Sequence, residues 1–223
     1  SRAGFVYLNN GSTGSVTFIG TVSPAGGNLK EPVTESTKKA ARAFYALAQG
    51  RADAKRYPAI DPIESYSKYL EYDEVIEHMD TLMEKGWVNK ILTLKDLLLR
   101  GKEARDQIDI LGDDGVPIDY HIAYNKAEIV DFVILQQNAF DKVDAATPLD
   151  RQKYMVNKVM SICDASYDFD GFEELNTYFK RVINLLRQMN FQQYNSDEFK
   201  RYEAEIDQAL KEKTVEFKEE NAA

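Results

Sequence analysis

The stretch FEELNTYFKRVINLLRQM at residues 172–189 decides the fold class, because its large apolar residues recur three or four positions apart. Such spacing puts them on one face of a helix with about 3.6 residues per turn. These residues are Phe172, Leu175, Phe179, Val182, Leu186 and Met189. A helix with one apolar face needs other helices to cover it, so the pattern predicts a helical bundle.

Similar spacing recurs on both sides of this stretch, in residues 91–111, 122–140, 147–163 and 195–210. Asn195 or Ser196 is a suitable N-cap for the last of these helices. Cys163 lies on an apolar stripe and is expected to be a buried thiol. Trp87 is expected to pack within the bundle, whereas His78 and His121 are expected to face solvent.

The helical part is predicted to begin at Asp61-Pro62-Ile63-Glu64. This tetrapeptide combines an aspartate cap, a proline at the first helical position and a glutamate that could close a capping box. No convincing strand pattern follows it. The α-helical domain is therefore expected to cover residues 61–223.

Residues 1–60 have a different pattern. The apolar run at 5–8 and the β-branched run at 15–22 indicate strands separated by turn residues, and residues 23–33 indicate a loop. A helix is predicted from Thr34, as N-cap, to Gly50. Two or three short strands do not make a stable sheet, so we expect a small, incomplete α/β piece. The chain also begins without Met, and we expect it to be part of a longer one.

Composition excludes several classes of protein. The 223 residues carry a net charge of −9, which argues against a nucleic-acid-binding surface. One cysteine cannot form a disulfide within the chain, and with two histidines it nearly excludes a His/Cys metal cage. No apolar run reaches the roughly 18 residues that would span a bilayer.

Three stretches resemble a known family. They are SVTFIGTVSPAGGNLKEPVT at 15–34, YPAIDP at 57–62 and LQQNAFDKVD at 135–144, preceded by Arg2-Ala3-Gly4. In order and spacing they resemble the catalytic A subunit of V-type and A-type rotary ATPases. The resemblance implies the C-terminal part of that subunit: an α/β remnant of the nucleotide-binding domain, followed by a mainly α bundle.

The resemblance also implies a nucleotide site shared with an upstream segment. The phosphate-binding loop GxxxxGK[ST], the Mg²⁺ ligands and the glutamate that activates water would lie there. Neither glycine-containing loop of this chain, at 11–14 or 26–30, has that pattern. We therefore expect no catalytic residue and no ATP hydrolysis from this chain alone.

What this part would supply is the adenine side of the pocket. The resemblance assigns Tyr57, fixed by Pro58, to one wall and Phe140 to the other, because a base stacks on an aromatic ring. Gln136 and Gln137 could hydrogen-bond the adenine edge, and Ala145 could let the base approach. From the residues alone, Tyr57 better suits a core aromatic at a strand end, and the two glutamines better suit a helix end and a solvated surface.

The implied partners are a B subunit, in an alternating A3B3 hexamer, and a central stalk. The turn at 108–119 would be a lever against the stalk, and the loop at 26–30 would approach it, although both also suit plain exposed turns. The head would be cytoplasmic and would reach the membrane sector indirectly. A non-catalytic B-type subunit, or a helical interaction module without nucleotide, remains the alternative.

Overall fold

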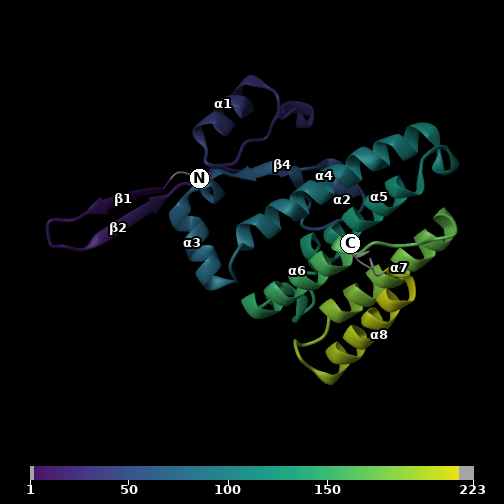
Figure 1. Cartoon of the computed structure of the whole chain (residues 1–223). Helices are drawn as coiled ribbons and strands as arrows, with labels where there is room; N and C mark the ends of the chain where they lie inside the picture. Colours follow the sequence, from purple (N-terminus) through teal and green to yellow (C-terminus); the bar gives the residue numbers. More distant parts are fainter. Residues whose placement is uncertain (1–2, 216–223) are drawn as a thin grey trace, which may run out of the picture. The chain divides into compact units, whose positions relative to one another are not determined.

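The computed structural model describes residues 3–215, and the chain divides into one unit through Asp80 and a second unit from Thr81. The first unit is a small α/β piece and the second is helical, so the predicted fold class is confirmed. The first unit contains two antiparallel two-stranded sheets and the helical segments between them (Figure 1). Its helical segments are η1 (Ala25–Gly27), α1 (Pro32–Ala40), α2 (Gln49–Asp53), η2 (Lys68–Glu71) and α3 (Asp73–Leu82), the last of which crosses the division.

The first sheet is a hairpin of β1 (Ala3–Tyr7) and β2 (Thr13–Thr17), in which Tyr7 pairs with Thr13. Its turn closes through a bond from the Gly11 amide to the Leu8 carbonyl, and Gly11 has a φ of 81°. Only glycine adopts that angle at little cost. The hairpin carries exposed apolar side chains, of which Tyr7 is 84% exposed. Both strands predicted for this region exist, shifted about two residues toward the N-terminus.

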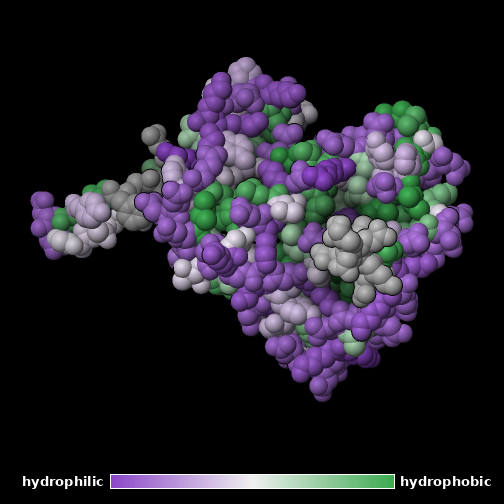
Figure 2. Space-filling view, in the orientation of Figure 1, coloured by the Kyte–Doolittle hydropathy of each residue, from purple (hydrophilic) through white to green (hydrophobic). Residues whose placement is uncertain are grey.

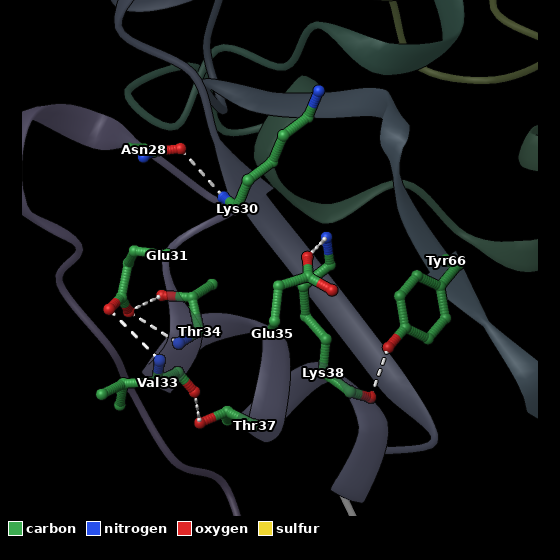
Figure 3. A network of polar contacts seen from close by, with 9 residues as sticks. All are labelled: Asn28, Lys30, Glu31, Val33, Thr34, Glu35, Thr37, Lys38 and Tyr66. Atoms are coloured by element: carbon green, nitrogen blue, oxygen red, sulfur yellow. Dashed lines mark hydrogen bonds and ion pairs between the residues drawn. The ribbon is translucent and has the colours of Figure 1, made fainter.

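Helix α1 is capped by Glu31 rather than by Thr34, so the predicted cap was wrong (Figure 3). The Glu31 carboxylate accepts the backbone amides of Val33 and Thr34 and the Thr34 hydroxyl. These bonds hold the pKa of Glu31 below its usual value. Proline at the first helical position makes the earlier start favourable, because it has no amide to satisfy. At the other end, the Tyr66 hydroxyl donates to the Lys38 carbonyl at 2.7 Å.

The second sheet corrects two predicted helices. Strand β3 (Ala43–Leu47) lies where the helix from Thr34 was expected to continue, and β4 (Ile60–Ser67) lies where the helical domain was expected to begin. Asp61 does accept the amides of Ile63 and Glu64, as an N-cap would. Here that turn forms a bulge in β4, because pairing with β3 on both sides of it keeps the backbone extended.

The second unit is a bundle of long helices. They are α4 (Trp87–Leu111), α5 (Ile118–Val130), α6 (Leu149–Asp164), α7 (Phe172–Asn190) and α8 (Asp197–Lys213), with short turns η3 (Asp113–Gly115), η4 (Asp131–Leu135) and η5 (Asp144–Ala146). The helices predicted near 91–111, 147–163, 172–189 and 195–210 are confirmed, and Ser196 caps α8.

Close packing holds the bundle together. Helices α4 and α5 form an antiparallel hairpin (Figure 1), and a Cβ added at Gly101 of α4 would lie 2.0 Å from the Ala127 Cβ of α5. The predicted stripe of α7 forms the core, since Leu175, Phe179 and Leu186 are fully buried. Trp87 and Cys163 are buried as predicted, and burial raises the pKa of the Cys163 thiol to about 12.

The helix predicted over 122–140 ends early. Helix α5 stops at Val130, and the π-helical turn η4 carries the chain to Leu135. Gln136 then has extended backbone, so Gln136, Gln137 and Phe140 lie outside the helix that the spacing predicted. None of the described helices is long and apolar enough to cross a membrane.

Phe179→Ala should lower the free energy of unfolding of the helical unit by about 3–5 kcal/mol, because it leaves a cavity in the core. Phe140→Ala is the matched control. That ring is 99% exposed, and its loss should change stability by no more than about 0.5 kcal/mol. Urea denaturation followed by far-UV circular dichroism measures both. Equal losses would contradict the assigned core.

Candidate functional site

Tyr57 lies in the first unit, in the connection between α2 and β4. It precedes Pro58 through a cis peptide bond, and its hydroxyl donates to the Ala52 carbonyl at 3.4 Å. The amide of Ala48 donates to the Ala59 carbonyl at 2.9 Å and closes the connection behind it. Tyr57 is 54% exposed. This argues against the core role that the residue pattern left open.

The other predicted residues lie in the second unit, on the loop at residues 136–147. Two aspartates organise this loop. The Asp141 carboxylate accepts the amides of Val143 and Asp144, each at 2.9 Å. The Asp144 carboxylate accepts the Asn138 amide at 2.6 Å, and the Asp144 carbonyl accepts the Gln137 side-chain amide at 2.8 Å. The loop is therefore closed by its own side chains.

Phe140 lies at the end of this network with its ring free. Its backbone amide donates to the Asn138 side chain at 3.0 Å, whereas its side chain is 99% exposed. Ala145 is also exposed, and its amide donates to the Asp141 carbonyl. A large apolar ring fully in solvent on an ordered loop gains free energy when a flat ligand covers it.

The two glutamines differ. Gln137 uses its side-chain amide inside the loop, through the bond to the Asp144 carbonyl. The Gln136 Nε2 atom is buried and has no hydrogen-bond partner among the described residues. An unsatisfied buried donor is costly. Gln136 therefore differs from Gln137 in having an unpaired side-chain nitrogen, although that nitrogen has almost no exposed surface.

A buried arginine anchors the loop from behind. Arg151 of α6 is 1% exposed, and its guanidinium donates to the Val143 carbonyl of the loop at 3.4 Å. The same group donates to the carbonyls of Met189 and Asn190 at the end of α7. The Met189 carbonyl also accepts the Gln192 amide at 3.1 Å. Both carbonyls lie in the last turn of α7, where the helix end carries partial negative charge that suits a cation.

Burial affects the ionisation of this pair. Burial raises the pKa of the Asp144 carboxyl. This effect outweighs the hydrogen bond from the Asn138 amide and the positive charge of Arg151, both of which lower that pKa. Burial also lowers the pKa of Arg151. Asp144 is 8% exposed. Both groups lose hydration when they are buried. The opposite charge of the partner and the hydrogen bonds that each group makes compensate for that loss.

The sequence missed Asp144 and Arg151. The aspartates at 141 and 144 follow Asn138 at the short spacing typical of Asx turns, which could have indicated a self-closed loop. Arg151 has no such signal, because a basic residue in the first turn of a helix resembles any surface charge. Of the predicted residues, Gln136, Gln137, Phe140 and Ala145 share this loop, whereas Tyr57 and Pro58 belong to the other unit.

The predicted lever turn at 108–119 is mostly exposed, although Ile108 is buried. Ile110 and Leu111 at the end of α4 are 75% and 56% exposed beside the acidic η3, and Figure 2 shows hydrophobic surface there.

His121 was predicted to face solvent, and that was wrong. It is 2% exposed, because its ring stacks on Phe172 and its Nε2 lies 2.9 Å from the Asp113 carbonyl. His78 is exposed, as predicted.

The second predicted stalk loop is ordered by local bonds. Gly26 and Gly27 have φ angles of 62° and 71°, and the Asn28 side chain accepts the Lys30 amide at 3.1 Å (Figure 3).

A groove of about 520 Å³, lined by polar side chains, runs along α6 beside α8. There Tyr154 donates to Glu203 and Lys158 pairs with Asp207, so its polar groups satisfy one another. Among residues 3–215, no cluster of three or more His, Cys, Asp or Glu suits a metal ion.

Comparison with known proteins identifies the class. Residues 1–67 match the nucleotide-binding domain of the ATP synthase alpha/beta family. Residues 77–166 match the C-terminal domain of V and A type ATP synthase. The two matches follow one another as the α/β and helical units do.

Individual relatives are more specific. The chain is 38% identical over 92% of its length to the V-type ATP synthase alpha chain of Protochlamydia amoebophila, and 40% identical over 89% of its length to that of Chlamydia abortus. It spans about a third of these relatives, 34% and 33% of their lengths. The chain belongs to the family of V-type ATP synthase alpha chains, in the region that contains the C-terminal domain. The B-type alternative is not supported, since the relatives named are alpha chains.

The Asp144 carboxyl should make stability depend on pH. Its raised pKa means that the folded state binds a proton that the unfolded state has already lost. Its contribution is therefore greatest below the unfolded value near 3.8 and is lost as pH rises to the folded pKa. The difference in unfolding free energy between wild type and Asp144→Asn should fall across that window in urea titrations. A difference that grows with pH would contradict the assignment.

Proposed function

We propose that this chain supplies the adenine side of the nucleotide site, and the lever that contacts a central stalk, in a complete V/A-type ATPase catalytic subunit. The observation that carries the proposal is Phe140, an aromatic ring fully exposed on a loop closed by Asp141 and Asp144. Tyr57 offers a second, half-exposed ring on a connection fixed by Pro58. The Gln136 side-chain nitrogen has no hydrogen-bond partner in the part of the chain that the structure describes, and we assign it to the base edge.

The phosphates and Mg²⁺ would be held elsewhere. The chain has no GxxxxGK[ST] loop, so the segment that binds the triphosphate would come from the remaining two thirds of the subunit. In such a division of labour, base stacking contributes affinity and orientation, and the metal and the attacking water act at the far end. Closure of the helical domain around nucleotide would then drive the lever.

The partners follow from the same family membership. A B subunit would alternate with this subunit in an A3B3 hexamer and donate an arginine to the γ-phosphate. The exposed tip of the α4–α5 hairpin would contact the stalk. The head would lie in the cytoplasm and couple to a membrane sector only through the stalk. A helical interaction module without nucleotide is less favoured, because Phe140 and Tyr57 are exposed rather than core residues.

In the full-length subunit within its complex, Phe140→Ala or Tyr57→Ala should weaken ATP and ADP binding. The loss of one stacked ring, worth about 1–3 kcal/mol, corresponds to roughly 5- to 150-fold in Kd. Phe18→Ala, another exposed phenylalanine, is the matched control and should bind normally. Titration with a fluorescent nucleotide measures all three, and unchanged affinity in both site variants would reject the proposed pocket.

The purified 223-residue chain should hydrolyse no ATP, with or without Mg²⁺, because nothing in it holds the γ-phosphate. A coupled phosphate-release assay tests this, with the complete complex as the positive control. Magnesium-dependent turnover by the chain itself would mean that the catalytic groups have been misassigned.

A further inference from the structure

Helix α7 connects two regions that the proposed function uses. It contains 19 residues, which is about 28 Å of helix. Its C-terminal end contacts the support of the 136–147 loop, and its N-terminal end contacts the support of the α4–α5 tip. Between these ends its apolar face is buried, and Phe179, Val182 and Leu186 have no exposed surface. A helix packed in this way moves as a rigid body.

The clamp at the C-terminal end consists of Arg151 and Asn190. The Arg151 guanidinium joins the carbonyls of Met189 and Asn190 to the Val143 carbonyl of the loop. The Asn190 side chain, which is 9% exposed, donates to the Val133 carbonyl at 2.9 Å. Val133 belongs to the π-helical turn η4 that leads into the loop. The end of α7 therefore holds the loop at both of its ends.

The clamp at the N-terminal end consists of His121 and Asn125 of α5. The His121 Nε2 donates to the Asp113 carbonyl of the tip turn at 2.9 Å, while its ring stacks on Phe172 with centroids 5.6 Å apart. One turn along, the Asn125 side chain donates to the Asn176 side chain at 3.1 Å. His121 and Asn125 are 2% and 5% exposed.

Helix α5 also runs from the tip toward the loop, but it does not reach it unbroken. The π-helical turn at Asp131–Leu135 interrupts its hydrogen-bond register. Such turns are rare and frequently lie at functional sites. The Asn190 bond to Val133 connects this turn directly to the end of α7.

We propose that α7 is a strut that couples the 136–147 loop to the tip of the α4–α5 hairpin. Arg151 of α6 and His121 of α5 are the positioning residues that contact its two ends. The proposal rests on the proposed function, because it assigns the loop to nucleotide and the tip to the stalk. Neither positioning residue needs to touch nucleotide or stalk. A change at one end is transmitted because both clamps are buried and hydrogen-bonded.

The test is hydrogen exchange by mass spectrometry on the full-length subunit in its assembled complex, without nucleotide. Arg151→Lys keeps the charge but loses the fork that bridges three carbonyls. It should raise exchange at least about threefold in the tip peptide at 112–117, with the mid-α4 peptide at 89–97 unchanged. Arg201→Lys, a matched change on the exposed arginine of α8, should alter neither peptide.

The reverse direction uses the other clamp. His121→Phe keeps the stacked ring but removes the donor to Asp113, and should raise exchange in the loop peptide at 137–145 to a similar extent. His121→Gln keeps a donor and should remain near the wild type. His78→Phe, at an exposed histidine, is the matched control. The strut would be overturned if neither Arg151→Lys nor His121→Phe changed hydrogen exchange at the far end of α7. It would also be overturned if exchange rose equally throughout the helical unit.

Added ADP separates this inference from the proposed function. In the wild type, ADP should protect both the loop and the tip, and in His121→Phe it should protect the loop alone. Tip protection that persists in His121→Phe would contradict the strut. Failure of ADP to protect the loop would contradict the proposed function, while the measurements without nucleotide still decide on the strut.

Discussion

The helical unit depends on one buried charge. Arg151 lies in the core with 1% of its surface exposed, and a guanidinium in such a place is tolerated only if protein groups replace water. The carbonyls at the end of α7, the loop carbonyl of Val143 and the Asp144 charge do so for its two terminal nitrogens, whereas its Nε is buried with no hydrogen-bond partner among the described residues. Because these acceptors come from α7 and from the loop, the arginine can stay buried only when the two are joined. Burial of this cation thus specifies where the loop lies on the bundle.

That constraint explains how an apolar ring can be fully exposed and yet well positioned. Asp141 and Asp144 close the loop from within, and Arg151 holds it from behind. Phe140 is therefore ordered by its backbone rather than by contacts of its ring. A binding surface of this kind loses little conformational entropy when a flat ligand covers it. The Gln136 side-chain amide nitrogen, which is buried and has no hydrogen-bond partner among the described residues, adds a polar group beside this apolar ring.

The long helices could be predicted because their apolar stripes are local signals that later packing only reinforces. The strands β3 and β4 could not, because an Asp-Pro-x-Glu helix start and a bulged strand share the same side-chain bonds from Asp61, and only pairing with residues 43–47 decides between them. Phe140 and the two glutamines were predicted as site residues by resemblance alone, and the helix proposed to hold them ends before them. Arg151 and His121 were missed or misjudged, since burial of a polar residue depends on contacts from distant helices.

The chain combines an α/β piece with a helical bundle, and we propose that the complete subunit uses them to bind the base and to carry the lever. The central proposal is that Tyr57 and Phe140 each contribute an aromatic ring to nucleotide binding. Photolabelling the assembled complex with an azidoadenine nucleotide, followed by peptide mapping, addresses that claim most directly. The account predicts label in the peptides that contain Tyr57 and residues 136–145, and its loss when excess ATP competes. Competable label confined to peptides outside these two segments would contradict it.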